Sequence, residues 1–124
     1  MYKARQLYIG YESSQTVEKQ GNRASIERYL RQGFYVKVSR NGYWVLVKPA
    51  KVDVTVDCGE NGRYNFNMKD EICNRYGHQR ISQNLVSKFY SDFSNGLIEV
   101  WADTTGYQIR WVKRGVEKLL FFIL

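Results

Sequence analysis

The sequence predicts an α+β fold, with a mainly antiparallel, curled sheet built from three β-hairpins and about three short helices packed on one side or end. Three pairs of strand-like runs are separated by short loops that contain glycine. Between them, apolar residues recur at helical spacing, bounded by Asn and Gly. The chain has 124 residues, enough to bury a sizeable core, so we expect a single domain, 1–124, with six or seven strands in its sheet.

The N-terminal stretch has two predicted parts. An apolar run around Leu7, Tyr8 and Ile9 predicts a short first strand. From Glu12 to Gly21 the residues are polar and poorly periodic. We therefore expect a loop or a frayed helical turn there, and the most mobile part of the chain.

A basic helix is predicted between Asn22, a typical N-cap, and Gly33, which is suited to end a helix. Glu27 and Arg31 have the spacing of an exposed ion pair along this helix. Two other cations of the helix are then candidate phosphate contacts, Arg23 and Arg28.

The strongest local signal is Phe34–Lys48, where Asn41-Gly42 separates two runs of β-branched and aromatic residues. Asn-Gly supplies the positive φ angles of a two-residue type I′ turn, so a hairpin is predicted. Opposed residues of a hairpin share a face. One face then has the composition of a core: Phe34, Val36, Val38, Val45 and Val47.

The other face of this hairpin mixes aromatic and basic side chains: Tyr35, Lys37, Ser39, Trp44, Leu46 and Lys48. Aromatic rings beside Lys and Arg can stack on bases and attract phosphates. The candidate binding residues are therefore Tyr35, Lys37, Arg40, Trp44 and Lys48. The alternative is that a helix packs over Trp44 and Leu46 while the lysine side chains extend to water.

A second hairpin is predicted from the alternation that starts at Lys51 and a loop that ends at Gly62. A three-residue loop places Val54 opposite Met68, Val56 opposite Phe66 and Cys58 opposite Tyr64. Two helices are predicted next, one from about Asn67 to Tyr76 and one that carries the apolar residues from Ile81 to Phe93 and stops at Asn95-Gly96.

These two helices suggest a helix-turn-helix motif, but His78 and Gln83 stand where the motif needs buried aliphatic residues. If the motif were present, the base-reading candidates would be Gln79, Arg80, Gln83 and Asn84.

A third hairpin is predicted around the loop Asp103–Gly106, with Val100 opposite Ile109. It supplies two further binding candidates, Trp101 and Arg110, the alternative for Trp101 being a place in the core. The apolar segment Leu119–Leu124 is predicted to be a buried last element or a partner interface.

Composition argues against several classes of protein. One histidine and two widely spaced cysteines do not make a zinc site, so no metal and no cofactor is expected. The sequence has no phosphate-binding glycine loop, nucleophile elbow or paired carboxylates, so we expect no catalytic residues and no enzyme. Without a signal-like or membrane-spanning apolar run, the protein is expected in the cytoplasm and not in a membrane.

The net charge of +7 is unevenly distributed. Residues 1–50 contain nine Lys/Arg against three acids, whereas the other 74 contain ten against nine. A basic part beside a neutral remainder is typical of polyanion-binding proteins. We therefore expect a non-enzymatic module that binds nucleic acid or a nucleoprotein complex. The alternative is a small inhibitor that occludes an acidic protein surface, for example a phage or mobile-element protein of the anti-defence or anti-CRISPR type.

Overall fold

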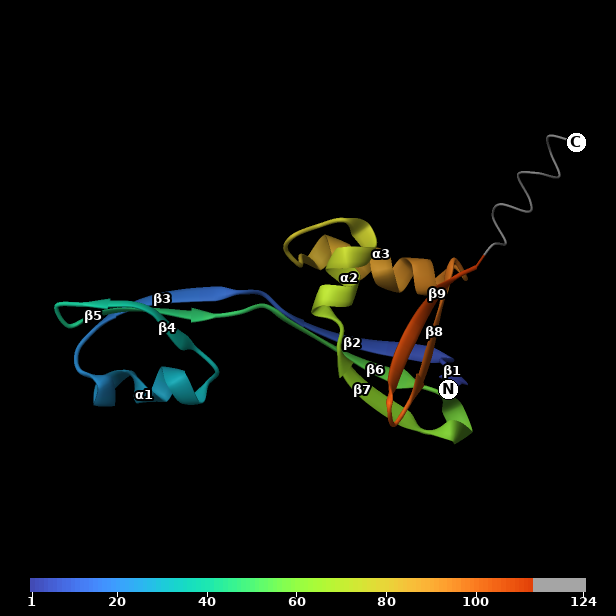
Figure 1. Ribbon diagram of the computed structural model, residues 1–124, viewed down its shortest axis with the longest axis horizontal. Coiled ribbons are helices and arrows are strands. Elements are labelled where there is room, and N and C mark those ends of the chain that lie inside the picture. The colour runs from blue at the N-terminus through green and yellow to red at the C-terminus, as the bar shows by residue number, and fades with distance from the viewer. Residues whose placement is uncertain (113–124) are drawn as a thin grey trace, which may run out of the picture. The chain divides into compact units, whose positions relative to one another are not determined.

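The computed structural model describes residues 1–112, which form two compact units. The larger unit combines Met1–Tyr11 with the described residues from Val52 onward, and the smaller unit is Glu12–Lys51. The described chain has three α-helices and nine strands, in three antiparallel sheets, which confirms the α+β class (Figure 1). The strands that we expected in one sheet are divided among three sheets of three. The predicted last element, Leu119–Leu124, lies outside the described residues.

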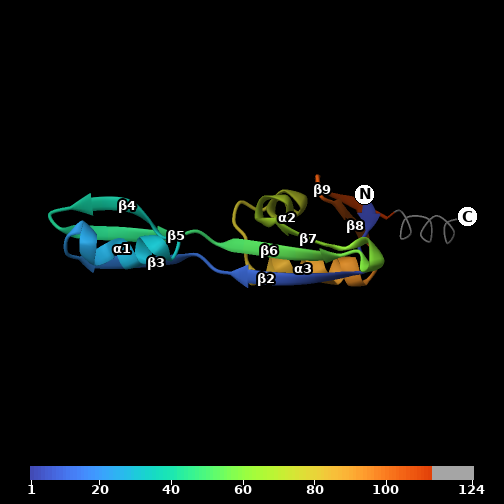
Figure 2. The ribbon, with the colours of Figure 1, turned by 90° about the horizontal axis from the view of Figure 1, so that it is seen from below.

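The larger unit contains two of the sheets. One has the order β1-β8-β9, made of Tyr2–Lys3, Ile98–Asp103 and Gly106–Trp111. The other has the order β2-β6-β7, made of Gln6–Glu12, Lys51–Asp57 and Arg63–Asn67. Two helices complete this unit, α2 (Lys69–Tyr76) and α3 (Gln83–Ser94), and α3 lies over one side of the β2-β6-β7 sheet (Figure 2).

Alternating apolar residues form the core of the larger unit. In β6, Val52, Val54 and Val56 are completely buried, as the period of two predicts. They belong to one buried cluster with Met68, the N-cap of α2, and with residues of β2, β8 and both helices, which include Leu7, Ile72, Leu85, Val86, Phe89, Ile98 and Val100.

The two helices of the larger unit begin and end near the predicted residues. Ser82 Oγ accepts a hydrogen bond from the N–H of Leu85, and Gly77 ends α2 with a φ of 67°. The hydroxyl of Tyr76 donates to Asp92 Oδ2 at 2.6 Å, and burial together with this bond raises the pKa of Tyr76 well above its usual value. Six residues connect the helices, more than the three or four of a helix-turn-helix, so the connection does not fit that motif.

The third hairpin has the predicted register, with Val100 opposite Ile109. The second hairpin differs from the prediction by two residues, because Val54 faces Phe66 and Val56 faces Tyr64. Its loop contains a 3₁₀ turn at Gly59–Asn61 and is therefore longer than predicted. Since the shift is an even number of residues, each side chain keeps its predicted face.

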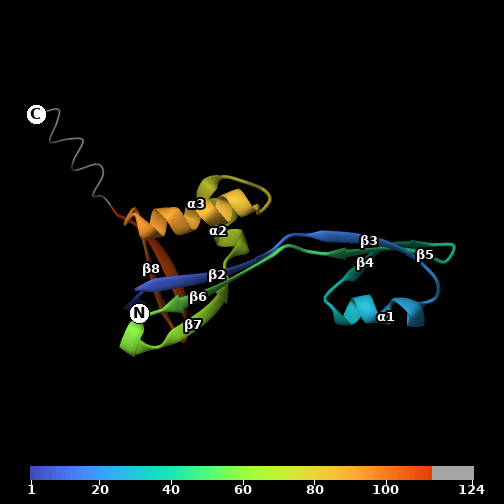
Figure 3. The same cartoon turned by 180° about the vertical axis from the view of Figure 1, so that it is seen from behind.

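The smaller unit is one sheet with one helix. The sheet has the order β3-β5-β4, made of Gln15–Gln20, Tyr43–Lys48 and Tyr35–Arg40. Helix α1 (Arg23–Arg31) lies against one face of it (Figure 3). Asn22 Oδ1 accepts the N–H of Ser25, and Arg31 lies 3.4 Å from Glu27, so the cap and the ion pair are confirmed.

Strand β3 corrects the prediction of a loop between Glu12 and Gly21. It pairs with β5 from Gln15 opposite Lys48 to Gln20 opposite Tyr43. Val17 is the one apolar residue of this strand, so side-chain periodicity gave no strand signal. The strand is stabilised by its backbone hydrogen bonds to β5, which the side-chain pattern does not show.

The hairpin of β4 and β5 has the predicted Asn41-Gly42 turn, with φ of 50° and 76°. Arg40 faces Tyr43 as predicted, but a β-bulge between Val36 and Val38 shifts the pairing beyond it. Val36 now faces Leu46, and Tyr35 faces Val47. The bulge therefore moves Tyr35 and Val36 to the faces opposite to those predicted.

The helix also covers the face that was not expected to be the core. The core between helix and sheet consists of the buried residues Ile26, Phe34 and Leu46, and Trp44 and Val36 pack against them. Leu46, Trp44 and Phe34 offer more apolar area than the valines of the other face, so burying them stabilises the fold more. The alternative prediction, a helix over Trp44 and Leu46, is the one that the structure has.

Neighbouring residues of β5 test this assignment of faces. We expect Leu46→Ala to lower the free energy of local opening by about 2–5 kcal/mol, because Leu46 is completely buried. Val45→Ala, on the opposite face, should cost less than about 1 kcal/mol. Native-state amide hydrogen exchange in β5 measures both values. A larger cost for Val45→Ala would contradict the assignment.

Candidate functional site

One face of the β3-β5-β4 sheet is covered by α1, and we call the opposite one the open face. Alternation and the observed register place three residues of each strand on it: Thr16, Glu18 and Gln20 of β3, Tyr35, Val38 and Arg40 of β4, and Tyr43, Val45 and Val47 of β5. Tyr35, Val38 and Tyr43 are 51%, 46% and 54% exposed. A group of exposed apolar side chains on one small sheet makes the open face a candidate binding surface.

Two predicted binding residues lie on the covered face instead. The indole N–H of Trp44 donates a hydrogen bond to the carbonyl oxygen of Gly21, and its ring packs on the core. Lys48 Nζ lies 6.0 Å from the ring centroid of Phe34 and 3.6 Å from Glu12. Both side chains are therefore engaged within the smaller unit, and the predicted surface of Tyr35, Trp44 and Lys48 is not a single face.

Five exposed cations of the smaller unit lie in two groups. On the side of α1, Arg23 and Arg28 are exposed on the helix, and Lys19 Nζ lies 5.4 Å from the ring centroid of Tyr29. On β4, Arg40 lies on the open face and Lys37 is the exposed extra residue of the bulge. Within residues 1–112, none of these five cations forms an ion pair.

Two of the three candidates of the larger unit are engaged with each other. The guanidinium of Arg110 lies 4.5 Å from the ring centroid of Trp101 and donates to Gln108 Oε1 at 2.8 Å. It therefore covers part of the half-buried indole. Arg80 is exposed in the connection between α2 and α3, where no described aromatic residue stacks on it.

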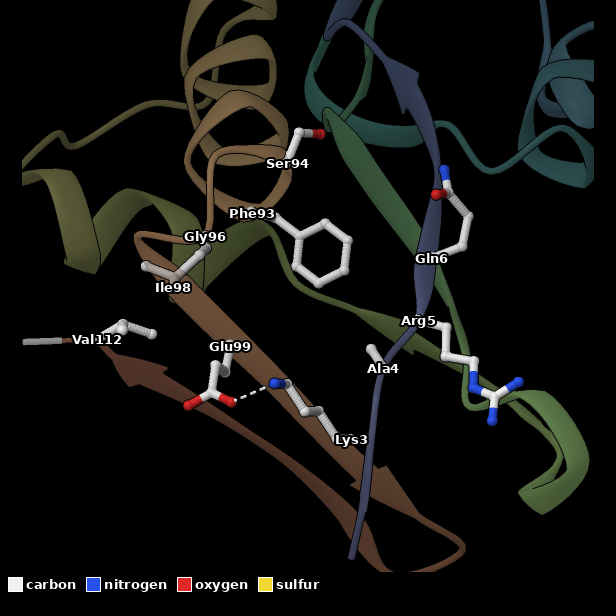
Figure 4. A pocket seen from close by; sticks show the side chains of 10 residues that line it. All are labelled: Lys3, Ala4, Arg5, Gln6, Phe93, Ser94, Gly96, Ile98, Glu99 and Val112. Atoms are coloured by element: carbon white, nitrogen blue, oxygen red, sulfur yellow. Dashed lines mark ion pairs between the residues drawn. The ribbon is translucent and has the colours of Figure 1, made fainter. Parts of the chain in front are cut away.

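Two cavities of the larger unit are large enough to hold a small molecule. One, of about 480 Å³, has Phe93 pointing into it and the ion pair of Lys3 with Glu99, 2.9 Å long, beside it (Figure 4). The other, of about 590 Å³, is lined by Cys58 and Trp101. Burial raises the pKa of the Cys58 thiol, which keeps it protonated and weakly reactive. Neither cavity is lined by an acid and base arranged around a nucleophile, judged on the described residues.

No three His, Cys, Asp or Glu residues among those described are grouped so that they could bind a metal ion. Of the described helices, none has the length and apolar character needed to span a membrane. Comparisons with protein-family models, curated proteins and solved structures found no match. The smaller unit is therefore the candidate site on grounds of exposure and charge.

Sequence reasoning missed most of the open face. Tyr43 was not a candidate, and Val38, Val45 and Val47 were assigned to the core. The bulge at Lys37 has no marker in the sequence, since neither Gly nor Pro stands there. The one available signal was the size of Leu46 and Trp44, which favours them as the buried side.

The structural role of Trp44 can be tested directly. We expect Trp44→Phe to lower the free energy of unfolding of the smaller unit by about 1–3 kcal/mol, because the Gly21 carbonyl loses its donor. Tyr43→Phe, on the open face, should change it by less than about 0.5 kcal/mol. Amide exchange in β5 measures both. Equal stabilities for the two variants would contradict a structural role for Trp44.

Proposed function

We propose that the protein is a non-enzymatic binding module and that its smaller unit binds nucleic acid. The proposal rests on the concentration of positive charge in this unit. Glu12–Lys51 contains eight Lys/Arg and three acids, a net charge of +5, which leaves +2 for the other 84 residues. Five of its cations are exposed and lack an ion pair within residues 1–112: Lys19, Arg23, Arg28, Lys37 and Arg40.

Unpaired surface cations favour a polyanion for a physical reason. Each Lys or Arg that neutralises a phosphate releases a condensed counterion, and the gain in entropy of the salt drives association. A cation that is already paired with a carboxylate contributes less, because the ion pair must first be broken. Arg31 and Lys48, which are paired, should therefore contribute less than Lys37 or Arg40.

The second candidate function is binding to a protein, as a small inhibitor that occludes its partner's surface. The open face supports it, because exposed Tyr and Val side chains beside a single arginine resemble the centre of a protein interface. For this function, aromatic-to-Ala substitutions should weaken binding more than substitutions of the cations.

Salt dependence tests the proposal. We expect labelled DNA or RNA to bind at 50 mM salt and to lose roughly tenfold or somewhat more in affinity by 200 mM, as the two or three phosphate contacts of one group of cations require. Lys37→Ala and Arg40→Ala, on β4, should each lower the slope of log affinity against log salt by about 1. Fluorescence anisotropy measures these values.

Arg80→Ala is the matched control, because Arg80 is also exposed but lies in the larger unit. Its slope should equal that of the wild type. Flat anisotropy traces at 50 mM salt would refute nucleic-acid binding. An equal loss for Arg80→Ala would show that the charge of the smaller unit is not what binds.

A further inference from the structure

The open face has a regular arrangement across β4 and β5. Three opposed pairs follow one another on it: Arg40 with Tyr43, Val38 with Val45, and Tyr35 with Val47. Successive pairs on one face of a strand are two residues apart, or roughly 7 Å. The two tyrosines thus lie at opposite ends of the row, with the pair of Val38 and Val45 between them.

From this arrangement we propose that the open face binds single-stranded nucleic acid, with unstacked bases on the rings of Tyr35 and Tyr43. The inference rests on the proposed function and names the form of its ligand. A base that stacks on an aromatic side chain must expose its own face, and in a duplex those faces are hidden between neighbouring base pairs. Stacking also suits a face of Tyr and Val, since it needs no hydrogen-bond donors.

The β-bulge supports this assignment, because it is what places both tyrosines on one face. Without the extra residue Lys37, Tyr35 would face Lys48 and lie on the side of α1. With it, Tyr35 faces Val47, on the same side as Tyr43. Bulges commonly re-aim side chains at functional sites. The same residue adds an exposed cation at the edge of the row.

The positive charge of the smaller unit favours nucleic acid over a second copy of the chain as the ligand of the open face. Two open faces in contact would bring together two units of +5, which repel each other. A polyanion is attracted by the same charge. The face itself carries Arg40 and Glu18 as its charged residues, so duplex phosphates would find few partners there. A flexible single strand can lay its bases on the face while its phosphates reach Arg40 and Lys37.

The experiment compares three probes of about 12 nucleotides by fluorescence anisotropy at 50 mM salt: oligo(dT), an abasic strand of the same length, and a duplex. The abasic strand keeps the phosphates but has nothing to stack. We expect oligo(dT) to bind roughly tenfold or more tightly than the abasic strand, and Tyr35→Ala and Tyr43→Ala each to lose a similar factor for oligo(dT) alone.

Two further variants make the test specific. Tyr43→Phe keeps the ring and should bind oligo(dT) like the wild type. Tyr8→Ala is the matched control, because Tyr8 is 50% exposed but lies in the larger unit. It should leave the affinity unchanged. Circular dichroism of each variant separates lost binding from lost folding.

Equal affinities for oligo(dT) and the abasic strand, or a preference for the duplex that neither tyrosine variant changes, would overturn single-strand stacking and leave phosphate binding in place. If none of the probes binds at 50 mM salt, the inference and the proposed function both fail, and an acidic protein surface becomes the partner to seek.

Discussion

The packing of Ile26 against Phe34 and Leu46 determines which side chains of the smaller unit are buried and which are left exposed. These are its buried apolar residues, and they hold α1 on one face of a three-stranded sheet. The helix can cover only one face of that sheet, so the other keeps its side chains in solvent. Which residues are available for binding therefore follows from which residues form the core.

Much of the architecture could be predicted from local signals. Asn41-Gly42 fixed the position of a turn, Asn22 and Gly77 marked helix ends, and the alternation from Val52 to Val56 identified a buried strand. These features depend on backbone conformation or on one-dimensional periodicity. The sequence did not predict strand β3, because a polar edge strand is stabilised by backbone hydrogen bonds, and these leave no pattern in the side chains.

The candidate site was harder to predict than the fold. The sequence placed the right residues on the hairpin, but the valine face was taken as the core although Leu46 and Trp44 lie on the face that α1 covers. One extra residue at Lys37 also reverses the sides of Tyr35 and Val36, which precede it in β4. Exposure of Tyr35 was correctly expected, whereas Trp44 proved to be part of the core. The charge asymmetry, by contrast, does not depend on register, and it corresponds to the smaller unit: eight cations and three acids in Glu12–Lys51.

The measurement that tests the central claim most directly is an NMR titration of the isotopically labelled full chain with a short single-stranded oligonucleotide. The account predicts that the amide signals that move are those of the open face, above all Tyr35, Val38, Tyr43 and Val45, while the signals of β6 and α3 stay in place. Shifts confined to the larger unit, or to α1 without the strands, would contradict it.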